Sequence, residues 1–400
     1  MRIAITNIAT IVTGDWREPF AEGDTVILDN GLIDRVGTAS AGELADCDLV
    51  VDAKGTTACP GLIDSQVHIA FGDYTPKQQA VGFLESYVHG GTTTSISASE
   101  IHVPGRPKDR QGVKALAVAA HKSWDNFRPG GMRVHGGAVI LEPCLEDSDF
   151  AELQANGVWL AKAGFGAVKT PFDYVPLVAA AKKAGMVVNV HTGGASISLA
   201  NSIHGEHLIA MQPDVAFHVN GGPIAMPDED FIRVVKETSV ALQICQAGNI
   251  RTALMCLNMA VDNDCFDRFL IATDTPTGTG VMPLGMIKSV TEMATLSDYP
   301  PEWMIAAATG NVAKVYRLNN GFLRAGKDAD LLLVDAPMGG SMKTCLDAIK
   351  HGDVWSLVAC FTAGVPRFIG RSRNTPPPLR QPKVLRSNVI NEFMTGQQFN

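Results

Sequence analysis

One pattern between Cys59 and about Asn319 limits the fold more than any other feature of this sequence: a short apolar run followed by an amphipathic stretch, found eight times. This alternation is typical of βαβ units, in which helices join parallel strands. Two intervening stretches, residues 175–184 and 230–238, have apolar residues at three- and four-residue spacing, as in helices that cover a sheet. The fold class is therefore α/β, and eight such units predict a closed (β/α)8, or TIM, barrel. The expected strands are Leu62 to Ser65, Thr92 to Ile96, Met132 to Val139, Val158 to Lys162, Met186 to Val190, Val215 to Val219, Val240 to Cys245 and Leu270 to Thr273.

The two ends of the chain have a different texture, with short apolar runs separated by turn residues. We expect residues 1–57 and 320–370 to build one small β-sandwich domain, and residues 58–319 to form the barrel. Residues 371–400 contain three consecutive prolines and little periodicity, which predicts an extended C-terminal arm that lies on a neighbouring subunit.

Composition excludes several classes of protein. The chain has 400 residues, 46% hydrophobic and 18% charged, which is enough for a barrel of about 250 residues and a second domain. A net charge of −8 gives no basic surface for nucleic acid. The first residues are typical of a strand rather than a signal peptide, and no apolar run of about 18 residues occurs, so we expect no membrane contact and a cytoplasmic location. The eight cysteines form no C-x-x-C pair, which favours reduced thiols.

Polar residues that follow the expected strands are the candidates for chemistry, because the active site of such a barrel lies at the carboxyl ends of its strands. A single histidine in such a place is usually structural, but several together converge on the barrel mouth. Imidazole and carboxylate groups are the ligands that zinc and related ions prefer. We therefore predict a metal site built from Gln66, His68, Lys162, His191, His218 and Asp274.

Two motifs resemble the amidohydrolase superfamily. Residues 60–68, P-G-L-I-D-S-Q-V-H, are similar to the opening P-G-[LF]-I-D-x-H-x-H of its members, and residues 321–331 are similar to the stretch that leads back into their β-sandwich. Other segments resemble the enamidase group, which opens the ring of a partly reduced oxonicotinate. These segments are residues 105–109, 134–141, 191–194, 218–223 and 274–285.

The resemblance implies roles for the matching positions. His191 and His218 would hold one metal ion, His68 and Asp274 would hold a second, and a residue of the fourth strand would bridge them. Asp274 would also act as the catalytic acid/base, taking a proton from the attacking water and delivering it to the leaving nitrogen. Zinc is the expected metal, with iron or manganese as alternatives, as one or two ions.

Two positions depart from the family pattern. Gln66 replaces the first histidine of the opening motif, and its amide oxygen is a weaker ligand than imidazole. The strand-four position is Lys162, whose ammonium would repel a cation. Either Lys162 is carboxylated by carbon dioxide and bridges the ions, or its ammonium replaces a metal charge in a one-metal site, or the strand is misplaced and Lys169 is the relevant lysine.

Substrate contacts are expected in the loops near the site. Arg106, with Lys108, could pair with a substrate carboxylate, because guanidinium binds carboxylate through two parallel bonds. Tyr74, His102 and His135 are the other candidates for the pocket wall.

Three functions are weighed. The first is hydrolysis of a cyclic amide or enamide in the catabolism of an N-heterocycle. The second is a one-metal lyase, decarboxylase or hydratase on the same barrel, since a fold does not fix its chemistry. It stays a candidate because Gln66 is a weaker metal ligand than the histidine of the family pattern. The third is a homologue that has lost its activity and serves only as an assembly partner. An inactive site would not need His68, His191, His218 and Asp274, so their presence is evidence against this function. The expected partners are a small-molecule substrate and further copies of the chain in a homo-oligomer, a tetramer or dimer.

Overall fold

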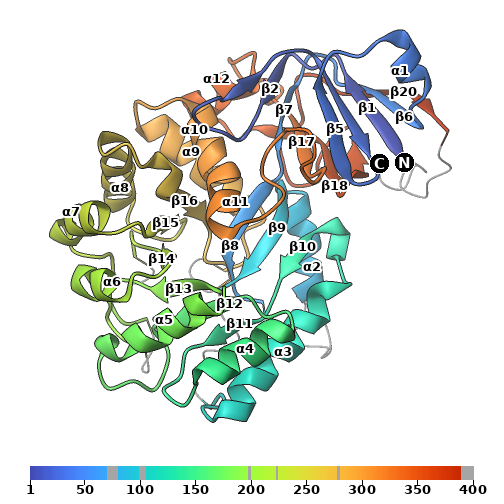
Figure 1. The fold of residues 1–400 in the computed structure, drawn as a ribbon. Coiled ribbons are helices and arrows are strands. Elements are labelled where there is room, and N and C mark those ends of the chain that lie inside the picture. The colour runs from blue at the N-terminus through green and yellow to red at the C-terminus, as the bar shows by residue number, and fades with distance from the viewer. Residues whose placement is uncertain (70–79, 99–104, 197–199, 222–223, 277–279, 389–400) are drawn as a thin grey trace.

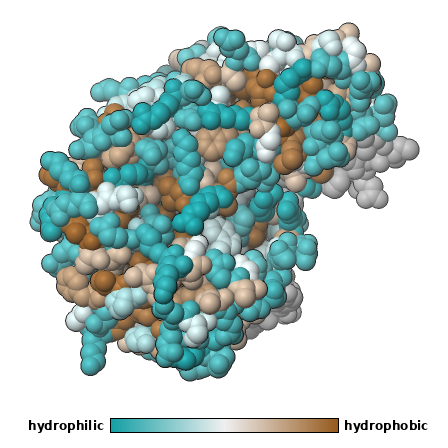
Figure 2. Space-filling view, viewed as in Figure 1, coloured by the Kyte–Doolittle hydropathy of each residue, from teal (hydrophilic) through white to brown (hydrophobic). Residues whose placement is uncertain are grey.

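The computed structural model describes residues 1–69, 80–98, 105–196, 200–221, 224–276 and 280–388. Figure 1 shows strands surrounded by helices in one part of the molecule, and a smaller part made mainly of strands beside it. Its visible face is mostly hydrophilic, with hydrophobic residues scattered among the polar ones (Figure 2). Within the described residues, no helix is long and apolar enough to cross a membrane.

Each of the eight predicted strand positions contains a parallel strand. The hydrogen-bonded order is β10-β9-β8 in one sheet and β11 to β16, in sequence order, in the other. The bounds are β8 (Leu62–Val67), β9 (Thr92–Ser97), β10 (Arg133–His135), β11 (Ala138–Ile140), β12 (Leu160–Ala163), β13 (Val187–His191), β14 (Val215–Phe217), β15 (Ala241–Cys245) and β16 (Phe269–Ala272).

The third predicted strand is divided in two, which corrects the expected run from Met132 to Val139. Gly137, between β10 and β11, has a φ of 92°, a left-handed conformation that interrupts a strand. At the other edge, the N–H of His68 donates to the carbonyl of Thr275 at 2.7 Å, and Val67 forms a parallel bridge with Thr275. The first strand position therefore lies beside the last.

Most of the helices pack around these strands, whereas α1 lies beside β6 (Figure 1), and local sequence explains two of the helix starts. The side chains of Asp109 and Asn249 accept hydrogen bonds from the first turns of α3 and α8. The predicted helices at 175–184 and 230–238 are confirmed as α5 and α7. The helices are α1 (Ala41–Ala45), α2 (Ala80–Val88), α3 (Arg110–Asp125), α4 (Asp147–Ala155), α5 (Tyr174–Lys183), α6 (Gly205–Met211), α7 (Asp228–Glu237), α8 (Ile250–Asp262), α9 (Gly285–Leu296), α10 (Pro301–Ala307), α11 (Gly310–Tyr316) and α12 (Cys345–His351).

Two further sheets combine strands from both chain ends. Their orders are β20-β6-β1-β4-β5 and β19-β18-β17-β7-β2-β3. One hydrophobic cluster contains residues of both sheets, among them Ile5, Leu28, Leu333 and Phe361. The bounds are β1 (Arg2–Thr6), β2 (Thr10–Val12), β3 (Phe20–Ala21), β4 (Thr25–Asp29), β5 (Leu32–Gly37), β6 (Leu49–Asp52), β7 (Thr57–Pro60), β17 (Leu331–Asp335), β18 (Ser356–Thr362), β19 (Val365–Ile369) and β20 (Lys383–Ser387).

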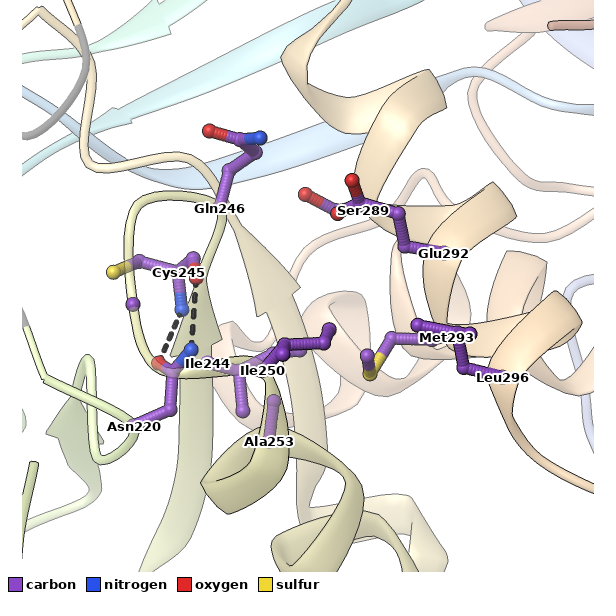
Figure 3. Close-up of a pocket in the computed structure, with 11 residues that line it drawn as sticks. Asn220, Ile244, Cys245, Gln246, Ile250, Ala253, Ser289, Glu292, Met293 and Leu296 are labelled. Carbon is purple, nitrogen blue, oxygen red and sulfur yellow. Dashed lines mark hydrogen bonds between the residues drawn. The ribbon is translucent and has the colours of Figure 1, made fainter. Parts of the chain in front are cut away.

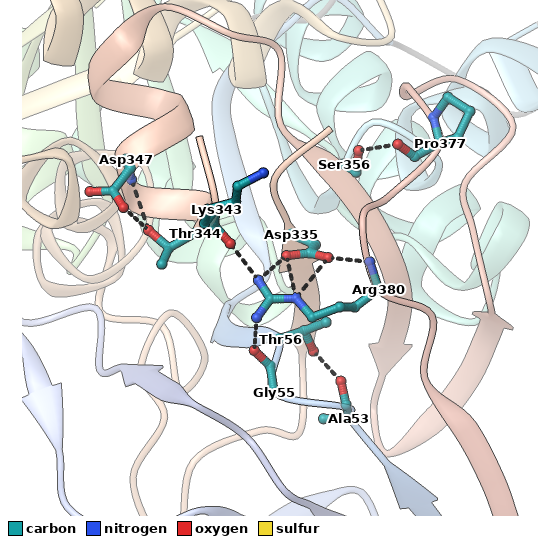
Figure 4. A network of polar contacts seen from close by, with 10 residues as sticks. All are labelled: Ala53, Gly55, Thr56, Asp335, Lys343, Thr344, Asp347, Ser356, Pro377 and Arg380. Atoms are coloured by element: carbon teal, nitrogen blue, oxygen red, sulfur yellow. Dashed lines mark hydrogen bonds and ion pairs between the residues drawn. The ribbon is translucent and has the colours of Figure 1, made fainter. Parts of the chain in front are cut away.

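The described part of the C-terminal segment, residues 371–388, is attached to its own chain. β20 pairs antiparallel with β6, and Arg380 forms an ion pair with the fully buried carboxylate of Asp335. Arg380 also donates to the carbonyls of Gly55 and Lys343, at 2.8 and 2.9 Å (Figure 4). These contacts hold the segment against strands β6 and β17.

Candidate active site

The six predicted ligands all lie at the carboxyl ends of barrel strands. Gln66 and Lys162 are next to the last residues of β8 and β12, and His191 ends β13. His218 follows β14 directly, and Asp274 lies two residues beyond β16. The side chains of five are almost completely buried, and that of His68 is 14% exposed. Parallel strands thus bring together residues that are far apart in the sequence.

His191 and His218 form one half of the site. Nδ1 of His191 lies 3.1 Å from Nε2 of His218. Nε2 of His191 lies 2.8 Å from the carbonyl of Gly194, so we assign its proton to Nε2 and its lone pair to Nδ1, facing His218. Burial, followed by the charge of His218, holds the pKa of His191 well below its usual value. Burial is also the main reason that the pKa of His218 is lowered to about 4.

Asp274 organises the other half. Its Oδ1 atom accepts a hydrogen bond from Nε2 of Gln66 at 2.8 Å and lies 2.9 Å from Nε2 of His68. Burial opposes ionisation of the carboxyl group, but the hydrogen bond from His68 and the nearby charges of His218 and Lys162 keep the pKa of Asp274 below its ordinary value. Asp274 is therefore a carboxylate at neutral pH.

Lys162, rather than Lys169, belongs to the site, because Lys169 is exposed on the surface. Nζ of Lys162 lies 3.8 Å from the centre of the Phe217 ring and 5.7 Å from that of Phe165. Burial lowers the pKa of Lys162 to about 7, although the charge of Asp274 acts in the opposite direction. Both the ammonium and the neutral amine are thus accessible near neutral pH.

The backbone at the site is strained. His218 and Asp274 have φ values of 38° and 62°, in the left-handed region that non-glycine residues rarely adopt. Such strain persists where the surrounding structure enforces it, and it clusters at functional sites. Gly164, with a φ of 108°, makes room for His191: a Cβ at Gly164 would lie 2.5 Å from that of His191.

The predicted substrate-binding residues do not come together as the six predicted metal ligands do. Arg106 is buried, forms an ion pair with Glu142 and donates to the carbonyl of Phe165 at 2.6 Å, so its charge is already matched and is not presented to a substrate as expected. His135 ends β10, and its ring contacts Trp159, the residue before β12, rather than Lys162 near the other end of β12. Lys108 is exposed. Tyr74 and His102 lie outside the described residues.

Asp64 is a site-supporting residue that the sequence reasoning missed, although it belongs to the P-G-L-I-D motif. Its carboxylate accepts hydrogen bonds from the N–H groups of Thr273 and Gln66, at 3.1 and 3.3 Å. It therefore connects β8 to the segment that carries Asp274. Burial raises the pKa of Asp64 to about 7, against the effect of the hydrogen bonds from Thr273.

A cavity of about 290 Å³ lies next to the site, between the loop after β15 and helices α8 and α9 (Figure 3). Asn220 and Cys245 are part of its wall, and the Asn220 side chain exchanges two hydrogen bonds with the backbone of Cys245, at 2.8 and 3.0 Å. Burial, and then the Asp274 carboxylate, raise the pKa of the Cys245 thiol. The charge of Asp274 thus acts on Cys245, a residue of the cavity wall.

A metal ion fits one half of this arrangement. In the described part of the chain, no group of three or more His, Cys, Asp or Glu residues is close enough to hold an ion. The histidine pair nevertheless has the spacing of two ligands: nitrogens bound to one tetrahedral zinc at about 2.0–2.1 Å are roughly 3.3 Å apart. Nδ1 of His218 is buried without a hydrogen-bond partner in the described structure. The donor and acceptor roles at this 3.1 Å contact depend on the tautomer of His218, and in the tautomer protonated at Nδ1 two lone pairs face each other, as a cation bound between them would require.

Comparison with known proteins agrees with these observations. Residues 57–360 match the model of the amidohydrolase family. The chain is 41% identical over 382 residues to enamidase from Eubacterium barkeri, which covers 95% of this chain and 99% of the relative.

Solved structures give the fold. A crystal structure of enamidase, described as a new member of the amidohydrolase superfamily, matches with a TM-score of 0.91 at 40% identity and covers 96% of this chain and 100% of that one. A dihydropyrimidinase from Brevibacillus agri matches with a TM-score of 0.66 at 15% identity, over 94% of this chain and 96% of that one, and shows the fold alone. The resemblance predicted from the motifs is confirmed.

Proposed function

Because this chain belongs to the amidohydrolase superfamily, a family of (β/α)8-barrel hydrolases that act on carbon–nitrogen bonds, we propose that it hydrolyses a cyclic amide or enamide with the help of a metal ion. The similarity to enamidase over almost the whole chain supports a ring-opening reaction in the catabolism of an N-heterocycle. The substrate is then a small molecule with a lactam, imide or oxonicotinate-like ring.

The pairing of His191 with His218 carries this proposal. Both imidazoles are buried and neutral, and their ring nitrogens converge at 3.1 Å. A divalent zinc, iron or manganese ion bound there supplies Lewis-acid chemistry, which activates water and polarises a carbonyl group. The hydrogen bond from His191 to Gly194 orients the ring for this task.

Asp274 is the proposed acid/base. A carboxylate with a lowered pKa accepts a proton from the attacking water and can return it to the leaving nitrogen of the opened ring. Gln66 and His68 both approach Oδ1, and no hydrogen bond from the described residues reaches Oδ2. Gln66 and His68 therefore fix the carboxylate while Oδ2 is available for proton transfer.

The decisive experiment combines metal analysis with a substrate screen. Purified protein should carry zinc, iron or manganese, and a chelator should abolish turnover of one or more cyclic imides, lactams or oxonicotinate derivatives. In ¹⁸O-labelled water, the product carboxylate should gain the label, which a lyase would not introduce. Full turnover by metal-free protein, or an unlabelled ring-opened product, would reject metal-dependent hydrolysis.

The larger organisation is also proposed from sequence and resemblance. Residues 1–57 and 320–370 would form a β-sandwich domain beside the barrel of residues 58–319, followed by the C-terminal segment 371–400. The mixed sheets and their common hydrophobic cluster support this division. We further propose a cytoplasmic homo-oligomer, a tetramer or dimer, whose mass light scattering can measure.

A further inference from the structure

We propose that this site holds one metal ion, on His191 and His218, and that the ammonium group of Lys162 provides the positive charge that a second ion would bring. The inference rests on the proposed metal-dependent hydrolysis and specifies how the site achieves it. It concerns Gln66, which bonds to Asp274, and Lys162, whose charge acts on His191, His218 and Asp274.

Gln66 turns its amide nitrogen towards the Asp274 carboxylate, while its oxygen Oε1 has no hydrogen-bond partner among the described residues. Its Nε2 atom donates to Oδ1 of Asp274 at 2.8 Å, and an amide –NH₂ group has hydrogens but no lone pair for a metal. Nε2 of His68 lies 2.9 Å from the same oxygen atom. Two nitrogen atoms thus crowd the carboxylate oxygen that a second ion would need. No further His, Cys, Asp or Glu of the described residues completes a ligand set there.

The aromatic ring next to Lys162 favours a cation over an anion. Its Nζ atom lies 3.8 Å from the centre of the Phe217 ring, and the face of an aromatic ring attracts positive charge and repels negative charge. A carboxylated Lys162 would place an anion against this ring and close to the Asp274 carboxylate. Only a second ion could offset that repulsion, and Gln66 leaves it no complete set of ligands.

Charge balance shows why one ammonium is sufficient. A carboxylated lysine with a second divalent ion would add a net charge of about +1, and an unmodified ammonium adds the same +1. Lys162 is 1% exposed, so its charge is weakly screened by water and can stabilise negative charge that develops on a substrate oxygen. Substitution of Lys162 therefore removes charge from the site but leaves the histidine pair intact.

Metal content and carbamate labelling test this inference independently of activity. Wild-type protein should hold about one metal equivalent, because it has one histidine pair. The double variant Gln66→His/Lys162→Glu restores an imidazole and a carboxylate. It should hold about two metal equivalents. Lys169→Glu is the matched control, because it makes the same charge change on the surface and should stay at the wild-type content. Wild-type protein supplied with ¹³C-bicarbonate should show no carbamate carbon by NMR.

The variant Lys162→Met distinguishes between two roles of Lys162, a charged group and a metal ligand. It should retain the ion, with turnover reduced roughly 100-fold or more, as expected for the loss of one preorganised electrostatic group. A second equivalent in wild-type protein, a carbamate signal, or loss of the ion in Lys162→Met would overturn the one-ion inference while leaving metal-dependent hydrolysis in place. Wild-type protein that binds no metal yet remains active would reject the proposed function itself.

Discussion

Gln66 and Asp274 are 208 residues apart in the sequence, and a hydrogen bond of 2.8 Å joins their side chains at the mouth of the barrel. The bond connects the end of the first barrel strand to the segment after the last one. It also fixes the orientation of the carboxylate on which the proposed chemistry depends.

Asp274→Asn should leave the fold and the metal content largely unchanged but lower kcat by roughly 10²-fold to 10⁴-fold, the usual contribution of a general acid/base. The amide oxygen can still accept the hydrogen bond from Gln66, but it cannot take up a proton from water. Steady-state kinetics with parallel metal analysis measure the effect. Asp264→Asn is the control, since Asp264 also has a positive φ, of 50°, and is exposed. Wild-type kcat in Asp274→Asn would contradict the acid/base role.

Gly164→Ala should displace His191, because the new Cβ would lie 2.5 Å from the Cβ of His191. We expect weaker metal binding and a free energy of unfolding lower by about 1–3 kcal/mol, from the contact and the positive φ together. Gly326→Ala is matched to it: Gly326 also has a positive φ, of 81°, but no atom lies within 4 Å of the added Cβ. If both variants lose the same metal affinity, the contact with His191 is not the cause.

His135 should make the stability of the protein depend on pH. Burial lowers its pKa from 6.5 to about 3, so below pH 6.5 the unfolded chain takes up a proton that the folded chain refuses. The free energy of unfolding should therefore fall as the pH decreases from about 6.5 to 3, by at most about 1.4 kcal/mol per pH unit from this residue.

Urea unfolding of His135→Gln across this pH range measures the contribution of His135. The variant should show a shallower decline than wild-type protein. His351→Gln, at an exposed position, should follow the wild-type curve. An equal slope in His135→Gln and wild-type protein would mean that His135 is protonated in the folded state.

Arg380→Ala should destabilise the attachment of the C-terminal segment. Removal of the guanidinium leaves the carboxylate of Asp335, which is fully buried, without its ion-pair partner (Figure 4). Breaking a buried pair costs about 3–5 kcal/mol, and we expect about 2–4 here because the Arg380 side chain is 32% exposed. Lys383→Ala, an exposed cation of the same segment, is the control in thermal and urea unfolding. Equal stability of the two variants would refute a structural role for the pair.

Much of the fold could be predicted because its signals are local. Most barrel strands are short apolar runs, β9 with its threonines being an exception, and the period of the intervening stretches identifies α5 and α7 within a few residues. The exception at the third strand has a local cause as well, since Gly137 permits the left-handed turn that divides it. The candidate ligands were recognisable because they lie at the ends of those strands or within two residues beyond them.

The sequence by itself determined where the strands run and which polar residues stand at their ends, because both depend on neighbours along the chain. Only the tertiary structure decided that Glu142 neutralises Arg106, that Trp159 covers His135 and that β20 returns to its own sheet. These contacts depend on the strand register and on how helices and loops pack over the sheets. Such relations join residues far apart in the sequence, and their energies come from burial and charge pairing that no local pattern records.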